Sequence, residues 1–219
     1  MVRKFPLAFA KLGRGEYPWR RSLAAALFLL AGLLGLPGPA LADRRSDQTY
    51  VEAEYLVNFL RYTQWPERCF ESADSPWVIS VVGPVEVADR VGDVAAAAGK
   101  VSGRPIVVLS IPFQRASLNS PLRSERDRQA LARMRGSHLV FFHGDANPLH
   151  PNAITDLWGR PILTVSDNPG FTASGGMLGL FKSSGRIVFE ANPGAIRNSG
   201  LMVSAKVLKL ARVAARTRP

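Results

Sequence analysis

Apolar residues recur along the chain in two alternating patterns. Four short runs rich in β-branched and other apolar residues predict buried strands, at 77–82, 106–109, 137–142 and 162–165. Segments with helical periodicity stand before and between these runs, at 50–62, 87–98, 124–135 and 154–158. Strands that alternate with helices indicate parallel β-α-β units, in which helices flank both faces of the sheet.

A glycine-rich corner followed by a hairpin is the most distinctive stretch of the chain. The strand at 162–165 stops at Asp167, where an Asn-Pro-Gly sequence requires a turn. Gly175 and Gly176 then lead into two apolar runs joined by hairpin residues, at 177–189. Because a hairpin adds antiparallel pairing, the sequence predicts a single-domain α/β fold with a Rossmann-like, mixed but mostly parallel sheet.

The first predicted helix is apolar on two sides. Tyr55 and Phe59 belong to one stripe, and Leu56 and Leu60 belong to another that lies roughly opposite. Such a helix is either central to the core or covered on its second face by a partner or a second copy, and the pattern leaves both open. We expect Leu56, Leu60 and Trp65, which closes the helix, as partner or dimer contacts.

A last helix is expected at 201–216. Its buried stripe would contain Val203, Val207 and Leu210, with Lys206 and other basic residues on the opposite side. A solvated basic face is the simpler interpretation, since cations near a helix C-terminus are stabilised by the helix dipole. Contact with anionic lipid is the alternative.

The N-terminal segment has the three parts of a secretory signal peptide. Residues 1–21 are basic, residues 23–36 are apolar, and the sequence Ala-Leu-Ala follows at 40–42. The apolar run is shorter than the roughly 20 residues that span a bilayer. We expect cleavage after Ala42, export to the periplasm and no stable membrane insertion, with an uncleaved anchor as the alternative. The chain would then comprise a signal peptide at 1–42 and one domain at 43–219.

Charge and cysteine content limit the kinds of partner and of covalent link that the protein can have. Six basic residues and one acid fall in residues 1–21, which leaves +6 of the net charge of +11 for the domain. This modest charge, on an exported protein, argues against a nucleic-acid partner. Cys69 is the only cysteine, so no intramolecular disulfide can form. An inert, half-buried thiol is favoured, and intermolecular pairing stays open.

Motifs for catalysis or metal binding are missing from the sequence. The three histidines form no H-x-x-x-H pair, and there is no C-x-x-C, no G-x-S-x-G and no phosphate-binding glycine loop. We therefore expect no metal, no cofactor and no enzymatic activity. For a hydrolase, a distant alternative, the catalytic candidates would be His143 and Asp167.

A ligand cleft is nevertheless expected, because open α/β sheets bind ligands beyond the carboxyl ends of their strands. In this sequence those ends fall at Gly83, Ser110, His143 and Ser166-Asp167. The candidate lining residues come from these ends and from the glycine-rich corner: Gly83, Ser166, Asp167, Phe171, Gly175 and Gly176. Asp167 has a second and commoner interpretation, as a cap of the turn that follows it.

Several blocks of sequence follow one another in a characteristic order. They are Glu54-Tyr55 with Phe59 and Trp65-Pro66, 78–83, Gly103-Arg104-Pro105-Ile106, 160–167 with Pro169-Gly170-Phe171, Gly175-Gly176-Met177, Phe189-Glu190-Ala191-Asn192, and 200–208. In these blocks, over nearly all of residues 43–219, the chain resembles the YfiR family of periplasmic proteins. The stretch from 160 to 177 is the most specific part.

The resemblance implies a compact, Rossmann-like and often dimeric regulator without enzymatic activity. YfiR-like proteins repress an inner-membrane diguanylate cyclase by binding its periplasmic sensor domain, which lowers cyclic di-GMP and biofilm formation. Some relatives respond to the redox state through cysteine pairs, which Cys69 alone cannot form. The expected partners are therefore such a cyclase domain and a second copy of the chain. The alternative is a periplasmic small-molecule-binding protein with its ligand in the cleft at the strand ends.

Overall fold

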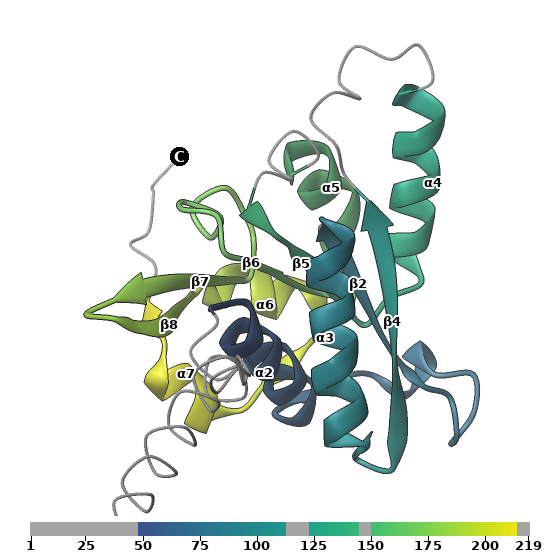
Figure 1. Cartoon of the computed structure of the whole chain (residues 1–219), viewed down its shortest axis with the longest axis horizontal. Coiled ribbons are helices and arrows are strands. Elements are labelled where there is room, and N and C mark those ends of the chain that lie inside the picture. The colour runs from purple at the N-terminus through teal and green to yellow at the C-terminus, as the bar shows by residue number, and fades with distance from the viewer. Residues whose placement is uncertain (1–47, 113–122, 145–149, 214–219) are drawn as a thin grey trace, which may run out of the picture. The chain divides into compact units, whose positions relative to one another are not determined.

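The computed structural model describes residues 48–112, 123–144 and 150–213, so the predicted signal peptide lies outside it (Figure 1). An eight-stranded sheet has the order β10-β8-β7-β6-β5-β2-β4-β3. Its strands are β2 (Trp77–Gly83), β3 (Lys100–Val101), β4 (Arg104–Pro112), β5 (Leu139–Phe142), β6 (Leu163–Ser166), β7 (Leu178–Ser183), β8 (Arg186–Ala191) and β10 (Arg212–Val213). The helices are α2 (Gln48–Arg61), a 3₁₀ turn η2 (Glu67–Cys69), α3 (Val85–Ala98), α4 (Arg123–Arg135), α5 (His150–Leu157), α6 (Pro193–Ser199) and α7 (Ala205–Leu210).

The sheet is mixed and mostly parallel, as the sequence predicts. Strands β4, β2, β5, β6 and β7 run parallel to one another, and β10 runs parallel to β8. Antiparallel pairing is confined to the β7–β8 hairpin and to β3 with the start of β4. The single α/β domain with its Rossmann-like arrangement is therefore confirmed. The β-branched runs formed the expected strands because strands buried on both faces need continuous apolar sequence.

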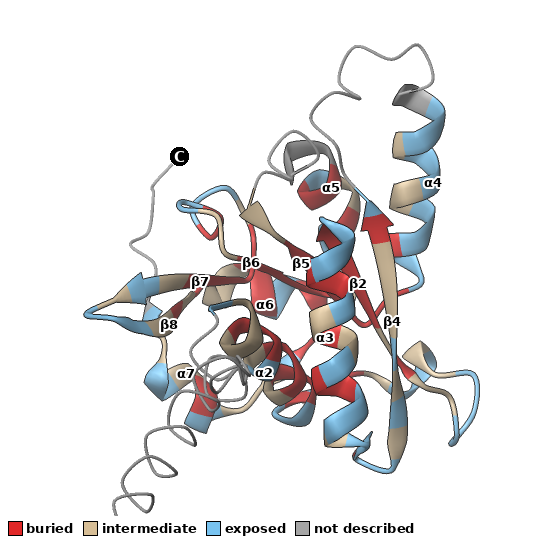
Figure 2. Ribbon diagram, in the orientation of Figure 1, coloured by how far each residue is buried: buried red, intermediate tan, exposed pale blue. Residues whose placement is uncertain are grey.

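Apolar side chains form two clusters, and β5 contributes to both. Leu139 and Phe141 pack in a cluster with residues of α2 and α3, whereas Val140 and Phe142 pack in a second cluster with residues of α4 and α5. Successive side chains of a strand point to opposite faces of the sheet. All four residues of β5 are consequently buried, and Figure 2 shows the buried residues running along the central strands.

Helix α2 is a core helix, and this corrects one expectation. Leu56 and Leu60 are 0% and 1% exposed, and Trp65 is buried as well, so they leave no surface for a partner or a second copy. The stripe of Tyr55 and Phe59 is covered by β8 of the same chain. Phe59 packs edge-to-face on Phe189 with ring centroids 5.3 Å apart. Both stripes are explained by the core of one molecule.

The C-terminal segment also differs from its prediction as a continuous helix over 201–216. Residues Met202–Val203 form strand β9, which pairs antiparallel with β1 (Thr63–Gln64), and only the six residues of α7 are helical. Of the predicted stripe, Val207 is buried but Leu210 is among the most exposed apolar residues described. Pairing with β1 and β8 outweighs the helical periodicity of the sequence, because tertiary contacts override local propensity.

Candidate functional site

The carboxyl edge of the central strands brings His143 and Asp167 together. Phe142 and Ser166 are register partners at the ends of β5 and β6, so the next residue of each strand emerges beside the other. His143 Nδ1 lies 2.8 Å from Asp167 Oδ2. The strand ends predicted from the sequence therefore lie along one edge, and two of the polar residues at those ends are in direct contact.

Gly83 ends β2 and lies against the same histidine. A Cβ atom added to Gly83 would be 3.1 Å from His143 Cβ, which is tighter than most real contacts. The two strands β2 and β5 are neighbours, yet the helices that follow them, α3 and α5, belong to different apolar clusters. Such a switch point between neighbouring strands is where open α/β sheets form their crevice.

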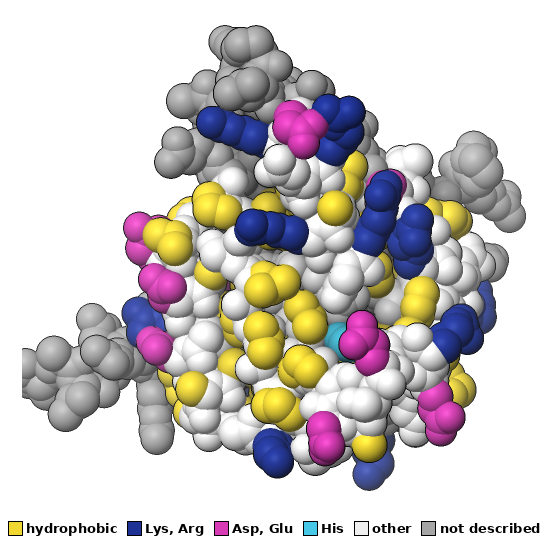
Figure 3. All heavy atoms as spheres, turned by 90° about the vertical axis from the view of Figure 1, so that its right-hand side faces the viewer, with side chains coloured by type: hydrophobic (Ala, Val, Ile, Leu, Met, Phe, Trp, Pro, Cys, Tyr) yellow, Lys and Arg dark blue, Asp and Glu magenta, His cyan; other side chains and the backbone are white. Residues whose placement is uncertain are grey.

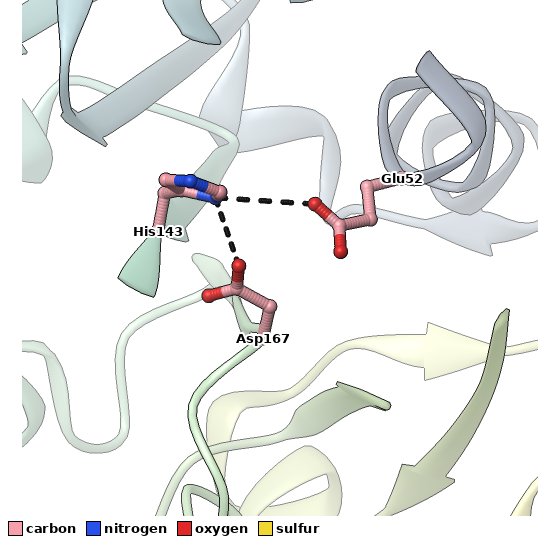
Figure 4. A group of neighbouring side chains, drawn as sticks. All are labelled: Glu52, His143 and Asp167. Atoms are coloured by element: carbon pink, nitrogen blue, oxygen red, sulfur yellow. Dashed lines mark ion pairs between the residues drawn. The ribbon is translucent and has the colours of Figure 1, made fainter. Parts of the chain in front are cut away.

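Glu52 of α2 completes the group, although sequence analysis did not select it. Its side chain is 1% exposed, and its Oε2 lies 3.9 Å from His143 Nδ1 (Figure 4). The spacing of Glu52 in the sequence could have indicated that its side chain is buried, although not which residues it meets. Glu52 precedes Leu56 and Leu60 by four and eight residues, so it occupies a core position of the helix and not its polar sector. A carboxylate at such a position requires partners, because burial of an uncompensated charge is costly.

Both carboxylates of this group are oriented by a donor on their other oxygen. Gln48 Nε2 donates to Glu52 Oε1 over 2.8 Å, one turn earlier in α2. The backbone N–H of Gly144 donates to Asp167 Oδ1 over 2.6 Å. The second oxygen of each carboxylate faces His143 Nδ1. One nitrogen and two oxygens from three separate elements therefore converge, all within 4.8 Å of one another.

This arrangement has the chemistry to hold a proton or a cation, and the hydroxyl adjacent in sequence does not serve it as a nucleophile. A His–Asp pair becomes a catalytic unit when a hydroxyl or thiol stands beside the free imidazole nitrogen. The hydroxyl adjacent in sequence, Ser166 Oγ, is fully buried and donates to Phe142 O over 2.7 Å. Ser166 Oγ also accepts a hydrogen bond from Asn168 N, which fixes the backbone at the end of β6. Ser166 is thus a structural residue and not part of a ligand site.

The glycine-rich corner, whose residues are candidates for lining a cleft, has a clear structural role. Phe171 is buried and packs on Phe142 with ring centroids 5.9 Å apart. A Cβ atom on Gly176 would be 2.2 Å from the Phe171 ring, so this position must be glycine. Gly175 has a φ of +99°, a conformation that other residues rarely adopt. These glycines allow the chain to close over Phe171.

A pocket lies at the opposite, amino edge of the same strands. Its volume is about 480 Å³, within the range of small-molecule sites. It is lined by residues that precede β5 and β6 together with η2 and its neighbours: Arg68, Cys69, Phe70, Glu71, Arg135, Gly136, Ser137, His138, Arg160, Pro161 and Ile162. This pocket therefore lies at the other end of the sheet from the strand ends at which a cleft is predicted.

His138 in this pocket is held as a neutral ring. Val78 N donates to His138 Nδ1 over 3.1 Å, so the ring proton is on Nε2, which lies 3.2 Å from Cys69 O. Desolvation lowers the pKa of His138, and the nearby Arg104 lowers it further, while the hydrogen bond to Cys69 O opposes the shift.

Burial raises the pKa of the Cys69 thiol, which agrees with an unreactive, half-buried cysteine.

The fold and the sites define a single mixed α/β domain with a polar group at one edge of its sheet and a pocket at the other. Over residues 48–112, 123–144 and 150–213, no helix has the length and apolar character needed to cross a membrane. Residues 49–212 match the YfiR/HmsC-like family, which spans three quarters of the chain and nearly all of the described residues. The protein belongs to this family, as its sequence blocks predict.

Proposed function

We propose that the protein is a non-enzymatic periplasmic regulator that represses an inner-membrane diguanylate cyclase by binding the periplasmic sensor domain of that enzyme. Membership of the YfiR/HmsC-like family over residues 49–212 carries this proposal. The sites agree with it, because the His143–Asp167 pair has no hydroxyl nucleophile in Ser166. Repression acts by population shift: the regulator binds the inactive arrangement of the sensor more tightly than the active one.

The outer edge of β4 is the surface that we assign to the partner. In the described part of the chain, β3 pairs only with Arg104 and Pro105, so the remainder of β4 is an edge strand. Val107 in that edge is 41% exposed. Figure 3 views the side of the molecule that carries β4 and α4, and hydrophobic side chains gather across its middle. An open strand edge with apolar side chains can accept a partner strand through main-chain hydrogen bonds.

Deletion of the gene tests the repression. Cyclic di-GMP and biofilm formation should rise in the deletion strain and return to the original level when the protein is supplied from a plasmid. A strain that also lacks the neighbouring membrane cyclase should show no rise. Unchanged cyclic di-GMP in the first strain, with the cyclase intact, contradicts the proposed function.

A pair of valine substitutions tests the surface. Val107→Glu places a charge on the β4 edge, whereas Val85→Glu alters a similarly exposed valine (47%) at the start of α3. Both variants should fold, because charges are tolerated on strand edges and acidic residues suit the first turn of a helix. We expect Val107→Glu to lose repression and binding to the purified sensor domain, and Val85→Glu to keep both. Equal binding by the two variants would place the contact elsewhere.

A small-molecule-binding role is the second candidate, and the pocket beside His138 favours it. Three arginines line this pocket against one acidic residue, Glu71, so an anionic ligand suits it best. Asp156 pairs with Arg135, and Arg160 Nε donates to Asp156 O, so Arg68 is the pocket arginine that these contacts leave for a ligand. In a thermal-shift screen of anionic metabolites, a metabolite that binds in the pocket should raise the melting temperature of the wild type and not that of Arg68→Ala. Arg61→Ala, on exposed α2 surface, is the matched control.

A further inference from the structure

We propose that Glu52, His143 and Asp167 form a binding site for a divalent transition-metal cation, with Zn²⁺ as the representative ion. The site joins three elements that are far apart in sequence: α2, the end of β5 and the end of β6. This inference does not depend on the repressor function, and it differs from the expectation that the sequence contains no metal site.

The donor set suits such an ion. Imidazole nitrogen and carboxylate oxygen are ligands of Zn²⁺ and of neighbouring divalent metals. A neutral imidazole with two carboxylates carries a charge of −2, which balances one divalent cation. A proton on the imidazole would balance only half of that charge, and Glu52 is 1% exposed, so its carboxylate receives little help from water.

The distances require only small adjustments. Zinc–ligand bonds of about 2.0–2.1 Å in a tetrahedral site place the ligand atoms roughly 3.3 Å apart. His143 Nδ1 is now 2.8 Å from Asp167 Oδ2 and 3.9 Å from Glu52 Oε2. One of these separations must open and the other close by about 0.5 Å each. The two carboxylate oxygens, which lie within 4.8 Å of each other, must also approach, and side-chain torsions can supply these movements. A metal binds the unprotonated nitrogen, so metal and proton compete for Nδ1.

The surroundings resemble the outer shell of a metal site. Gln48 donates to Glu52 Oε1 and Gly144 N donates to Asp167 Oδ1, so that the other oxygen of each carboxylate is aimed at the histidine. The His143 side chain is 24% exposed, which gives an ion a path from solvent. A fourth ligand position would be taken by water or by a group from a partner.

Metal titration of the purified, chelator-treated protein tests the site. We expect one Zn²⁺ to bind per chain by calorimetry. A concentration about 100-fold above the dissociation constant should raise the melting temperature by roughly 5–10 °C. Chelator should reverse the rise. Co²⁺ in the same site should show the visible absorption of a four-coordinate complex.

Matched variants decide whether these three residues are the ligands. Glu52→Gln and Glu54→Gln change a buried and an exposed carboxylate on the same helix. Asp167→Asn is the second test variant, in case Glu52→Gln does not fold. It should fold because it retains an oxygen that can accept from Gly144 N. We expect Glu52→Gln and Asp167→Asn each to weaken Zn²⁺ binding at least about tenfold, whereas Glu54→Gln and Cys69→Ser bind as the wild type does. The proposal is overturned if the wild type binds no Zn²⁺ or Co²⁺, or if folded Asp167→Asn binds with unchanged affinity.

Discussion

Two histidines flank β5, one at each edge of the sheet, and their surroundings are opposite. His138 precedes the strand and is enclosed by Phe70, Trp65 and Trp77, with its ring stacked on Phe70 at 4.7 Å. His143 follows the strand and faces two carboxylates. Four strand residues separate the two, and nothing in the local sequence distinguishes their roles. The difference arises from what the rest of the chain packs around each end.

The same side chain therefore packs among aromatic rings at one edge of the sheet and contacts acidic groups at the other. His138 has both ring nitrogens engaged by backbone groups and is held neutral. His143 instead offers one nitrogen to acidic partners that are themselves oriented by Gln48 and Gly144. We therefore expect substitutions at the amino edge to affect folding, and substitutions at the carboxyl edge to affect charge and ligand interactions.

The largest effect should follow from His138→Ala. This change removes the stacking on Phe70, worth about 0.5–1.5 kcal/mol. It also leaves the partly buried Val78 N–H without its acceptor, at a cost of roughly 1–3 kcal/mol. Urea unfolding should show a loss of about 2–4 kcal/mol. His143→Ala should cost less than about 1 kcal/mol without metal, since its ring is partly exposed and its ion pair is partly screened. Equal losses would remove the distinction between the two edges.

A smaller effect should appear as coupling between His143 and Asp167. Stabilities of His143→Gln, Asp167→Asn and the double variant form a double-mutant cycle. The 2.8 Å contact between Nδ1 and Oδ2 predicts a coupling energy of about 1 kcal/mol, because the pair is only partly shielded from water. High salt should reduce it. A cycle between His138→Gln and Asp167→Asn, at opposite edges, is the control and should give additive values.

The smallest effect should be the dependence of stability on pH at the amino edge. Because desolvation lowers the pKa of His138 in the folded protein, the unfolded chain takes up a proton at higher pH than the folded one. As the pH falls below about 6.5, the unfolded state binds more protons, so the free energy of unfolding decreases until the folded pKa is reached. His138→Gln, which stays neutral, should lose less stability than the wild type between about pH 7.5 and pH 5.5. An identical pH profile for the two proteins would show that His138 is not held neutral by the fold.

Strands and their carboxyl ends could be predicted from the sequence, because a buried parallel strand leaves a local apolar signature. His143 and Asp167 were placed at one edge by this argument. Glu52 was not, because its position depends on how α2 docks on the sheet, and no local pattern encodes that docking. The same limit applies to Phe171 and Gly176, whose fit only appears once the corner closes. The pocket at the amino edge was missed because η2 lies beside β5 only in the folded chain.

Helix α2 also sets the order of events during synthesis. Tyr55 OH donates to Ile187 O, 132 residues later, and Thr63 pairs with Val203. The side of the first described helix that carries Tyr55 and Phe59 therefore stays uncovered until almost the last strand has been made. Contacts of such long sequence separation slow folding and prolong the exposure of apolar surface. Nascent chains that stop before β8 should consequently depend on chaperones, whereas chains that reach β9 should close without assistance.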